Sequence, residues 1–448
     1  MPLPHARRTL ATALLVLAAA CSSPSDGGQG GPTPPPPTDN SAAWLRANAH
    51  PIRSLSVNDR DFSDLQPLKA AIGNARVVML GEQTHGDGTT FLAKARLIAF
   101  LHQEMGFDVL AWESGLWDVH QVWAHVQAGE AVLPASRRGI FGVWTGSQQV
   151  LPTLDYVAET VGTARPLELA GFDSQLTGSL AIDSLYLLMD RFARRIGSPV
   201  ADDPEWPAVA GSLGRLALGE DFQSKPPVAD QARLLKLLAA LRVDALAKAG
   251  TDRDALFWAQ VLESVTAFAQ ALWSRGPDGP VPEDFNARDR QMARNLVWLA
   301  NVWYPDKKII VWAASSHIAR DVAQLKTTGG STLYGSGWTV HMGNEAYTSL
   351  GTQMYALGFT AGYGEFGWWG NVPTLMPTVR EGSLEARFYQ AGLVNAFVDF
   401  RAPVAGSEWL RDVFARPFGY LDLAGDWTRV LDGMIYTRDM TPSTTATR

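Results

Sequence analysis

One run of residues organises much of the chain: Val77-Val78-Met79-Leu80-Gly81-Glu82-Gln83-Thr84-His85-Gly86. Its four leading apolar residues indicate a buried strand, which the glycine then ends. Apolar residues recur every three or four positions from 91 to 105, which predicts a helix that Gly106 ends. A second apolar run, 107–112, follows at once. Strand, helix and strand within about 40 residues match the size of a parallel βαβ unit.

Polar residues follow several apolar runs of this kind. The runs 107–112, 167–172 and 308–313 each lead into a carboxylate or a histidine. Because parallel strands end at the same edge of a sheet, where open α/β sheets bind ligands, we expect these polar groups to converge. Taken singly, a Glu or a His in such a loop is more often solvated or structural. The groups expected to converge are Glu82, His85, Glu113, Asp173 and His317.

The middle of the chain has a different pattern. Residues from about 179 to 275 are rich in Leu and Ala at helical spacing, which predicts a helical insertion of four or five helices. The chain therefore predicts an α/β fold with a mostly parallel central sheet, flanking helices and a helical insertion subdomain. We expect this domain to span residues 42–440 and roughly the last dozen residues to be disordered.

Composition limits the partners. The chain has 448 residues, a formal charge of −7 and a pI near 5.7. No strong basic patch is visible, and the acidic balance argues against a nucleic-acid partner.

The N-terminus resembles a targeting segment. Arg7 and Arg8 precede an apolar run, 9–20, which is too short to span a bilayer as a helix. Small residues then lead into Cys21, the only cysteine. We expect residues 1–20 to be a signal peptide, so that the protein is exported.

Two processing routes fit this segment. Ordinary secretion is one. The favoured route is lipidation of Cys21 after cleavage, although Leu17 stands one position earlier than in the usual bacterial lipobox. Residues 21–41 are rich in Ser and Gly and then in Pro, as in a tether. We therefore expect a protein anchored by lipid to the bacterial cell envelope, at the periplasm or the cell surface.

Several common catalytic signatures are absent. The chain has no G-x-S-x-G elbow, no H-E-x-x-H and no P-loop. Residues 362–367 match G-x-G-x-x-G, but the residues after them do not predict a helix, so we do not interpret them as a dinucleotide site.

The remaining candidates are histidines and carboxylates at strand ends. A neutral imidazole is the usual general base, and a neighbouring carboxylate stabilises the imidazolium that forms. With no nucleophilic side chain in evidence, water is the natural nucleophile, so no cofactor is required. The same groups could instead bind a divalent metal, as a metal-dependent hydrolase or as a binding protein without turnover. Those metal-ligand candidates are Glu82, His85, Glu113 and His317.

Blocks of the sequence resemble the erythromycin esterase family. The first block is 81–86, followed by Lys94 and Glu113. Later blocks are Gly171-Phe172-Asp173, 288–295, and 311–313 leading to His317. Their order from about residue 60 to about 400 makes the resemblance specific.

The resemblance implies an α/β core and a hydrolase that opens a macrolide lactone or a related ester with water, the basis of macrolide antibiotic resistance. It implies that His85 is the general base and that Glu82, Glu113 and His317 complete the catalytic set. Asp173 and Arg288 are candidate substrate contacts, for which a structural salt bridge is an equal alternative. Related proteins of the wider superfamily bind metal or haem, so an exported metal- or haem-binding lipoprotein is the alternative function.

One motif departs from the family pattern. The late motif usually reads Trp-Ala-His-Asn-x-His, but here Ala314 replaces its first His and Ser315 its Asn. A cleft without that imidazole fits a different substrate, weak macrolide activity or none. Export also indicates that the substrate is an ester of the cell envelope or of the environment.

Overall fold

The computed structural model describes residues 40–448 except 277–280, 334–336, 338 and 402–403. The expected signal peptide, Cys21 and nearly all of the expected tether therefore lie outside the described residues. Within the described part of the chain, no helix is long and apolar enough to cross a membrane.

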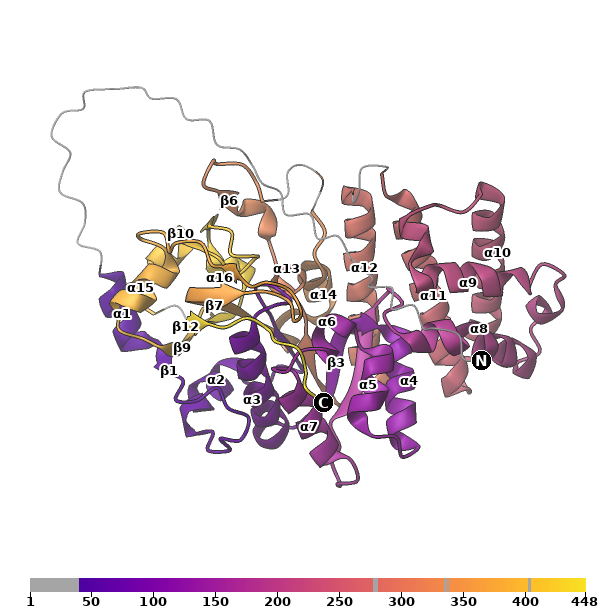
Figure 1. The fold of residues 1–448 in the computed structure, drawn as a ribbon, viewed down its shortest axis with the longest axis horizontal. Helices are drawn as coiled ribbons and strands as arrows, with labels where there is room; N and C mark the ends of the chain where they lie inside the picture. Colours follow the sequence, from indigo (N-terminus) through magenta and orange to yellow (C-terminus); the bar gives the residue numbers. More distant parts are fainter. Residues whose placement is uncertain (1–39, 277–280, 334–336, 338, 402–403) are drawn as a thin grey trace. The chain divides into compact units, whose positions relative to one another are not determined.

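A nine-stranded sheet forms the centre of the fold (Figure 1). Its order is β1-β9-β12-β7-β2-β5-β3-β4, and β8 pairs with β7. The strands from β12 to β4 run parallel, whereas β1, β9 and β8 pair antiparallel. The predicted α/β fold with a mostly parallel sheet is confirmed. The strands are β1 (His50–Pro51), β2 (Val77–Leu80), β3 (Phe107–Gly115), β4 (Glu168–Asp173), β5 (Lys308–Trp312), β7 (Met354–Phe366), β8 (Thr374–Leu375), β9 (Asn395–Asp399) and β12 (Gly433–Met440).

Helices surround this sheet, and a small antiparallel sheet of three strands accompanies it. The small sheet consists of β10 (Val413–Ala415), β11 (Leu423–Gly425) and β6 (Lys326–Thr327). The principal helices outside the insertion are α1 (Ser41–Asn48), α2 (Gln66–Ile72), α3 (Gly88–Met105), α4 (Leu116–Gln127), α5 (Val132–Gly139), α6 (Gly142–Thr145), α7 (Leu151–Thr160), α12 (Pro282–Trp298), α13 (Ser315–Ile318), α14 (Met342–Leu350), α15 (Leu384–Gln390) and α16 (Trp427–Val430).

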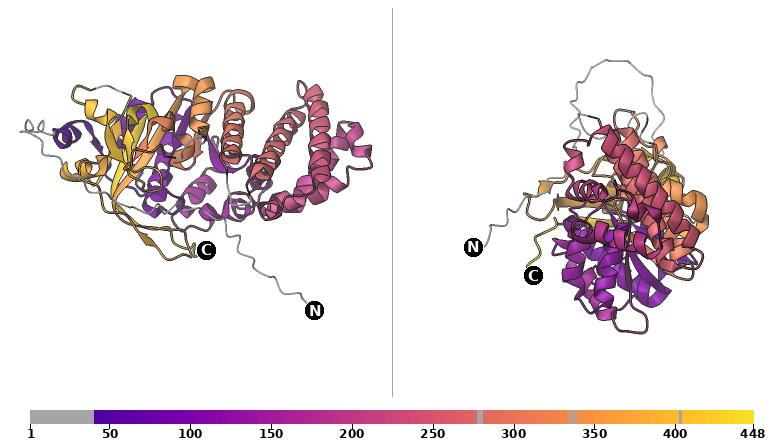
Figure 2. Two further views of the ribbon diagram at one scale, coloured as in Figure 1. Left: turned by 90° about the horizontal axis from the view of Figure 1, so that it is seen from above. Right: turned by 90° about the vertical axis from the view of Figure 1, so that its right-hand side faces the viewer.

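The interval expected to be a helical insertion contains four α-helices between β4 and β5. They are α8 (Ser179–Arg195), α9 (Ala208–Leu218), α10 (Val228–Lys248) and α11 (Arg253–Ser274). Helix α10 packs on α11, and α11 packs on α12, so this group continues from the sheet through α12 (Figure 2).

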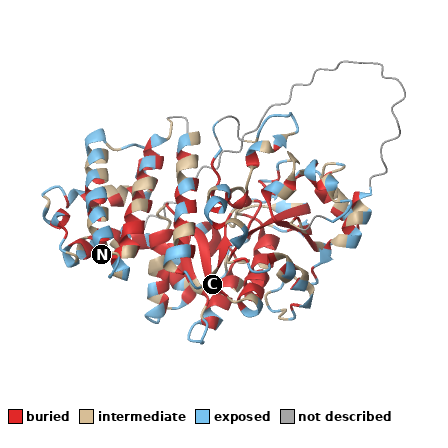
Figure 3. Ribbon diagram, turned by 180° about the vertical axis from the view of Figure 1, so that it is seen from behind, coloured by how far each residue is buried: buried red, intermediate tan, exposed pale blue. Residues whose placement is uncertain are grey.

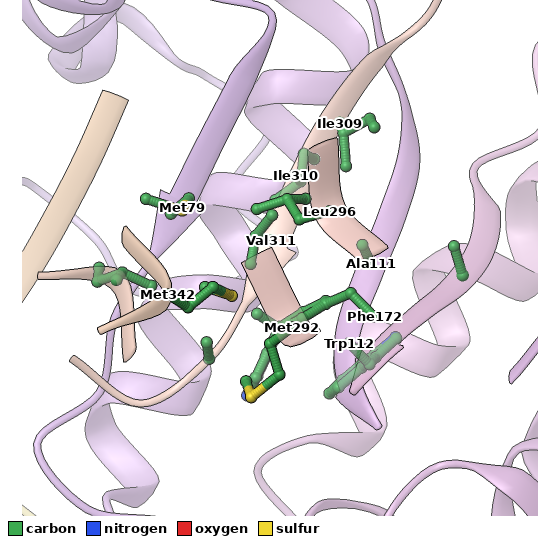
Figure 4. Close-up of a cluster of buried hydrophobic side chains, with 14 of the residues drawn as sticks. Met79, Ala111, Trp112, Phe172, Met292, Leu296, Ile309, Ile310, Val311 and Met342 are labelled. Carbon is green, nitrogen blue, oxygen red and sulfur yellow. The ribbon is translucent and has the colours of Figure 1, made fainter. Parts of the chain in front are cut away.

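The core lies on the central strands. Every residue of β2 is buried, and burial follows the strands rather than the outer faces of the helices (Figure 3). Val311 of β5 lies beside Met292 and Leu296 of α12, and Met79 of the adjacent strand β2 belongs to the same buried cluster (Figure 4). Each such fully buried apolar side chain contributes about 1.5–3 kcal/mol. This packing holds the strand ends, and the polar residues after them, in place.

The sheet differs from the sequence prediction in strand order and in strand ends. β5 lies between β2 and β3, so the two strands of the predicted βαβ unit are not neighbours. β3 also runs past Trp112 to Gly115 with an irregular register between them, which places Glu113 inside the strand.

The C-terminus contradicts the expectation of disorder. Beyond β12, the chain makes isolated antiparallel bridges from Pro442 to Asp87 and from Thr445 to Ser147. The Ser443 N–H also donates to the Gly86 carbonyl at 2.9 Å. Backbone pairing therefore orders a segment whose small polar side chains predict no regular element.

Candidate active site

Glu82 is the centre of a buried cluster at the end of β2. Its Oε1 lies 2.7 Å from His85 Nδ1 and accepts a hydrogen bond from Trp144 Nε1 at 3.1 Å. Its Oε2 accepts from Lys94 Nζ at 2.6 Å. Glu82 and Lys94 are fully buried, but the His85 side chain is 17% exposed. His85 is therefore the member of this cluster that a substrate can reach.

The fold explains why these groups meet. Gly81 is packed so closely that an added Cβ would lie 2.5 Å from Ser315 Oγ, and its N–H continues the β2–β7 ladder to the Leu357 carbonyl. Glu82 and His85 then follow in a tight turn, and Lys94 returns from α3. A lysine in a buried helix face requires a charged partner, and Glu82 provides it.

The pKa values of His85 and Lys94 are shifted in opposite directions. Burial lowers the pKa of His85, but the hydrogen bond to Glu82 and the negative charges of Glu113 and Glu82 outweigh it, so the pKa is raised above its usual 6.5. Burial lowers the pKa of Lys94 despite the attraction of Glu82. With Nδ1 held by Glu82, His85 presents Nε2 as its proton acceptor.

A second carboxyl fixes the turn that carries His85. Asp87 Oδ2 accepts from the Thr84 N–H at 2.5 Å, and its Oδ1 accepts from Thr84 Oγ1 at 2.9 Å and from Tyr420 Oη at 2.8 Å. Burial raises the pKa of Asp87 to about 7. The turn is therefore held by side chains on both sides of His85.

A second cluster forms at the ends of β3, β4 and β5. Arg288 from α12 donates to Glu113 Oε1 at 3.0 Å and makes two bonds to Asp173, at 3.2 and 2.6 Å. His317 lies between two carboxylates: Nε2 is 3.2 Å from Glu113 and Nδ1 is 2.9 Å from Asp289. The structural salt bridge considered for Asp173 and Arg288 is thus present.

This second cluster is held in its ionised form. Burial lowers the pKa of His317, but Asp289 and Glu113 raise it to about 10. Burial raises the pKa of Glu113, but His317, His85 and Arg288 hold it well below its usual value. The paired carboxylates raise the pKa of Arg288 despite its burial. At neutral pH His317 is therefore an imidazolium, which donates hydrogen bonds and does not accept a proton.

The loop after β5 joins the two clusters. The Ala313 carbonyl lies 3.4 Å from Lys94 Nζ, and the Ala314 N–H donates to Glu113 Oε2 at 2.9 Å. The Ser315 N–H donates to the Glu82 carbonyl at 2.8 Å. Position 314, where the family pattern has a histidine, thus acts here through its backbone.

The residues considered as metal ligands fall into separate clusters. Glu82 is paired with Lys94 and His85, whereas Glu113 is paired with Arg288 and His317. Among the residues that the structure describes, no three His, Cys, Asp or Glu side chains are arranged to hold a metal ion. Protein cations already occupy the carboxylates, so this donor set fits a metal poorly.

Sequence reasoning placed the strand-end residues but missed several partners. Trp144 comes from the short helix α6, and no local pattern links it to Glu82. Asp289 lies beside Arg288 in a quoted block, but no role was predicted for it. His341, which no sequence pattern marks, lies next to this site: its ring centroid is 5.8 Å from that of Phe285, which also stacks on His317. Lys94 was part of the first block without a predicted role, although a lysine within the apolar face of α3 was a signal for a buried ion pair.

Comparisons with known proteins agree with this architecture. The family model for erythromycin esterase matches residues 102–438. "Putative hydrolase YbfO" of Bacillus subtilis (strain 168) is 26% identical over 89% of this chain and 91% of its own. "Erythromycin esterase type II" of Escherichia coli is 23% identical over 80% of this chain and 88% of its own. A solved structure of a mutant of the erythromycin esterase EreC, in its open conformation, has a TM-score of 0.64 at 16% identity and covers 86% of this chain and 96% of that one.

Proposed function

The chain belongs to the erythromycin esterase family, and from this we propose that it is a hydrolase that cleaves a lactone or a related carboxylic ester with water. The observation that carries the proposal is the His85–Glu82 pair. Its imidazole is partly exposed, and its carboxylate is buried and held by Lys94 and Trp144.

In the proposed reaction His85 acts as the general base. Nε2 takes a proton from water while the water oxygen attacks the carbonyl carbon, and Glu82 stabilises the imidazolium that forms. The imidazolium then returns the proton to the departing alkoxide as the tetrahedral intermediate collapses. Lys94 balances the charge of Glu82 without taking part in proton transfer.

In this proposal the second cluster supplies the positive charge that stabilises the oxyanion of the tetrahedral intermediate. We assign stabilisation of the oxyanion to Arg288, whose side chain is 21% exposed, and the buried His317 imidazolium adds positive charge beside it, since both of its N–H groups already bind carboxylates. Glu113 and Asp289 hold His317 in position. In this assignment Glu113 orients the positively charged His317, while Glu82 alone orients the base, His85.

Macrolide-type lactones are the first substrates to test, because the Escherichia coli relative is named an erythromycin esterase. Purified protein is assayed with macrolides, simple lactones and aryl esters, each with and without chelator. Removal of a general base costs about 10²–10⁴-fold, so His85→Ala is expected to lose that much. His125→Ala, at a side chain 41% exposed on α4, is the matched control and keeps full activity.

Two results would overturn parts of the proposal. Equal rates for wild type and His85→Ala would remove His85 from the base role. Loss of activity with chelator, restored by a divalent ion, would replace metal-free hydrolysis with a metal-dependent mechanism.

We also propose that the protein is exported and anchored to the cell envelope through lipid on Cys21, with the ester substrate met outside the cytoplasm. The signal-like segment supports this proposal. Cys21→Ser is expected to move the protein from the membrane fraction to the soluble exported fraction. Equal fractionation of both forms would exclude the anchor.

A further inference from the structure

Two consecutive tryptophans follow β7 and have different environments. The Trp369 indole N–H lies 2.9 Å from the Val143 carbonyl and 3.2 Å from the Gly142 carbonyl. Its ring fits closely over Gly146, where an added Cβ would lie 2.3 Å from the ring. Trp369 therefore fastens this segment to α6, the helix that carries Trp144.

Trp368, in contrast, lies next to the candidate base. Its ring centroid lies 6.3 Å from that of His85, with the planes at 44°. The ring is half-buried, whereas Trp144, whose ring centroid is 5.2 Å from that of His85, is completely buried. Trp368 is thus a partly exposed aromatic ring next to His85.

The segment that carries Trp368 is held in place and is apolar at its surface. The Gly367 N–H donates to the Gly86 carbonyl at 3.2 Å, which links it to the residue after His85. Val372 is 89% exposed and Leu375 is 74% exposed on the same segment. A partly exposed aromatic ring near the proposed base, with exposed apolar side chains on the same segment, is typical of a surface that binds an apolar part of a ligand.

We propose that Trp368 is a specificity-determining residue that binds the apolar acyl or alcohol part of the ester next to the scissile carbonyl. The inference rests on the proposed hydrolase function and adds a substrate class: esters and lactones with an extended apolar moiety, favoured over short polar esters. The ring contacts substrate without moving a proton. Its removal therefore weakens the binding of long apolar substrates and leaves the chemistry on short ones intact.

The test compares two esters with one leaving group, 4-nitrophenyl octanoate and 4-nitrophenyl acetate. Trp368→Ala is expected to lower kcat/KM for the octanoate roughly tenfold, mainly through KM, and to change the acetate less than about threefold. Trp368→Phe keeps a ring and recovers most of the octanoate activity. Tyr389→Ala is the matched control, because it removes an exposed ring that packs on Tyr363 instead of on His85.

The outcomes separate the two proposals. If wild type hydrolyses both esters and Trp368→Ala lowers them equally or not at all, the specificity role is wrong and the hydrolase proposal stands. If wild type hydrolyses no ester or lactone, the hydrolase proposal fails and the specificity role fails with it. A selective loss on the octanoate, rescued by Trp368→Phe, supports both.

Discussion

Replacing Lys94 by Met tests the electrostatic design of the His85 cluster. The Lys94 ammonium is fully buried, lies 2.6 Å from Glu82 Oε2 and stands 4.3 Å from the centre of the Trp312 ring. Methionine keeps most of the apolar stem and removes the charge. The change therefore isolates the ion pair from the packing around it.

The expected loss of stability follows from leaving a buried carboxylate without its cation. Removing one partner of a buried pair costs about 3–5 kcal/mol. Glu82 keeps its hydrogen bonds to His85 and Trp144, so we expect a value near the lower end, about 3 kcal/mol in the free energy of unfolding. A surface pair is worth at most about 1 kcal/mol.

The same substitution should alter the pH dependence of hydrolysis. Without the lysine, only protonation of His85 balances Glu82, so the pKa of His85 rises further. Lys94 and His85 bind the two oxygens of one carboxylate, at 2.6 and 2.7 Å, so loss of the lysine charge acts directly on the ring. The acid limb of the pH–activity profile, where the base becomes protonated, should therefore move to higher pH.

Urea unfolding and a pH–rate profile measure the two effects. Lys236→Met is the control, since that lysine is 64% exposed and pairs with Glu205 at the surface. The double variant with Glu82→Gln should regain much of the lost stability, because the unpaired charge is gone. A loss for Lys94→Met no larger than for the control, or an unmoved acid limb, would refute the coupling of Lys94 to His85.

Three further changes test other parts of the molecule. The pKa of His317 is raised to about 10, so its ion pairs stabilise the fold fully below about pH 6.5 and this contribution is lost as the pH rises toward 10. In His317→Gln the urea midpoint should therefore fall less between about pH 6.5 and pH 10 than in the wild type. An equal fall in both proteins would contradict the pairing of His317 with its carboxylates. Gly86→Ala places a Cβ 2.5 Å from the backbone carbon of Gly367 and should cost about 1–3 kcal/mol in thermal unfolding, whereas Gly214→Ala, open on α9, should gain up to about 1 kcal/mol. Truncation after Met440 removes the backbone bonds to the loops at Gly86 and should lower both the melting temperature and kcat; full activity in the truncated chain would show that the tail does not position the site.

Local pattern predicted where β2 and β5 end, but not where β3 ends. The glycine after β2, the aspartate that ends β4 and the polar residues after β5 lie where the alternation of apolar runs and polar residues indicated. Each of these features depends on only a few neighbouring residues, because a buried parallel strand must be apolar and the chain must turn where the strand ends. The mostly parallel sheet follows from the same repetition.

Spatial order could not be predicted in this way. Nothing near 77–86 shows that β5, more than 200 residues later, lies between β2 and β3. Yet this order decides the chemistry, since it brings the Ala313–Ser315 loop between the clusters and pairs Glu113 with His317. The C-terminal tail was mispredicted for a related reason: its order comes from backbone bonds to loops distant in sequence.

The two histidines show why residue type alone does not assign a catalytic role. His85 contacts one carboxylate, which shares its charge with Lys94, and the imidazole keeps an exposed edge. His317 contacts two carboxylates and is almost fully buried, so its proton is held to about pH 10. A base must release and accept a proton near neutral pH, whereas an electrophile must keep it. The number of carboxylates around each ring therefore supports the proposed roles, with His85 as the base and His317 as a source of positive charge.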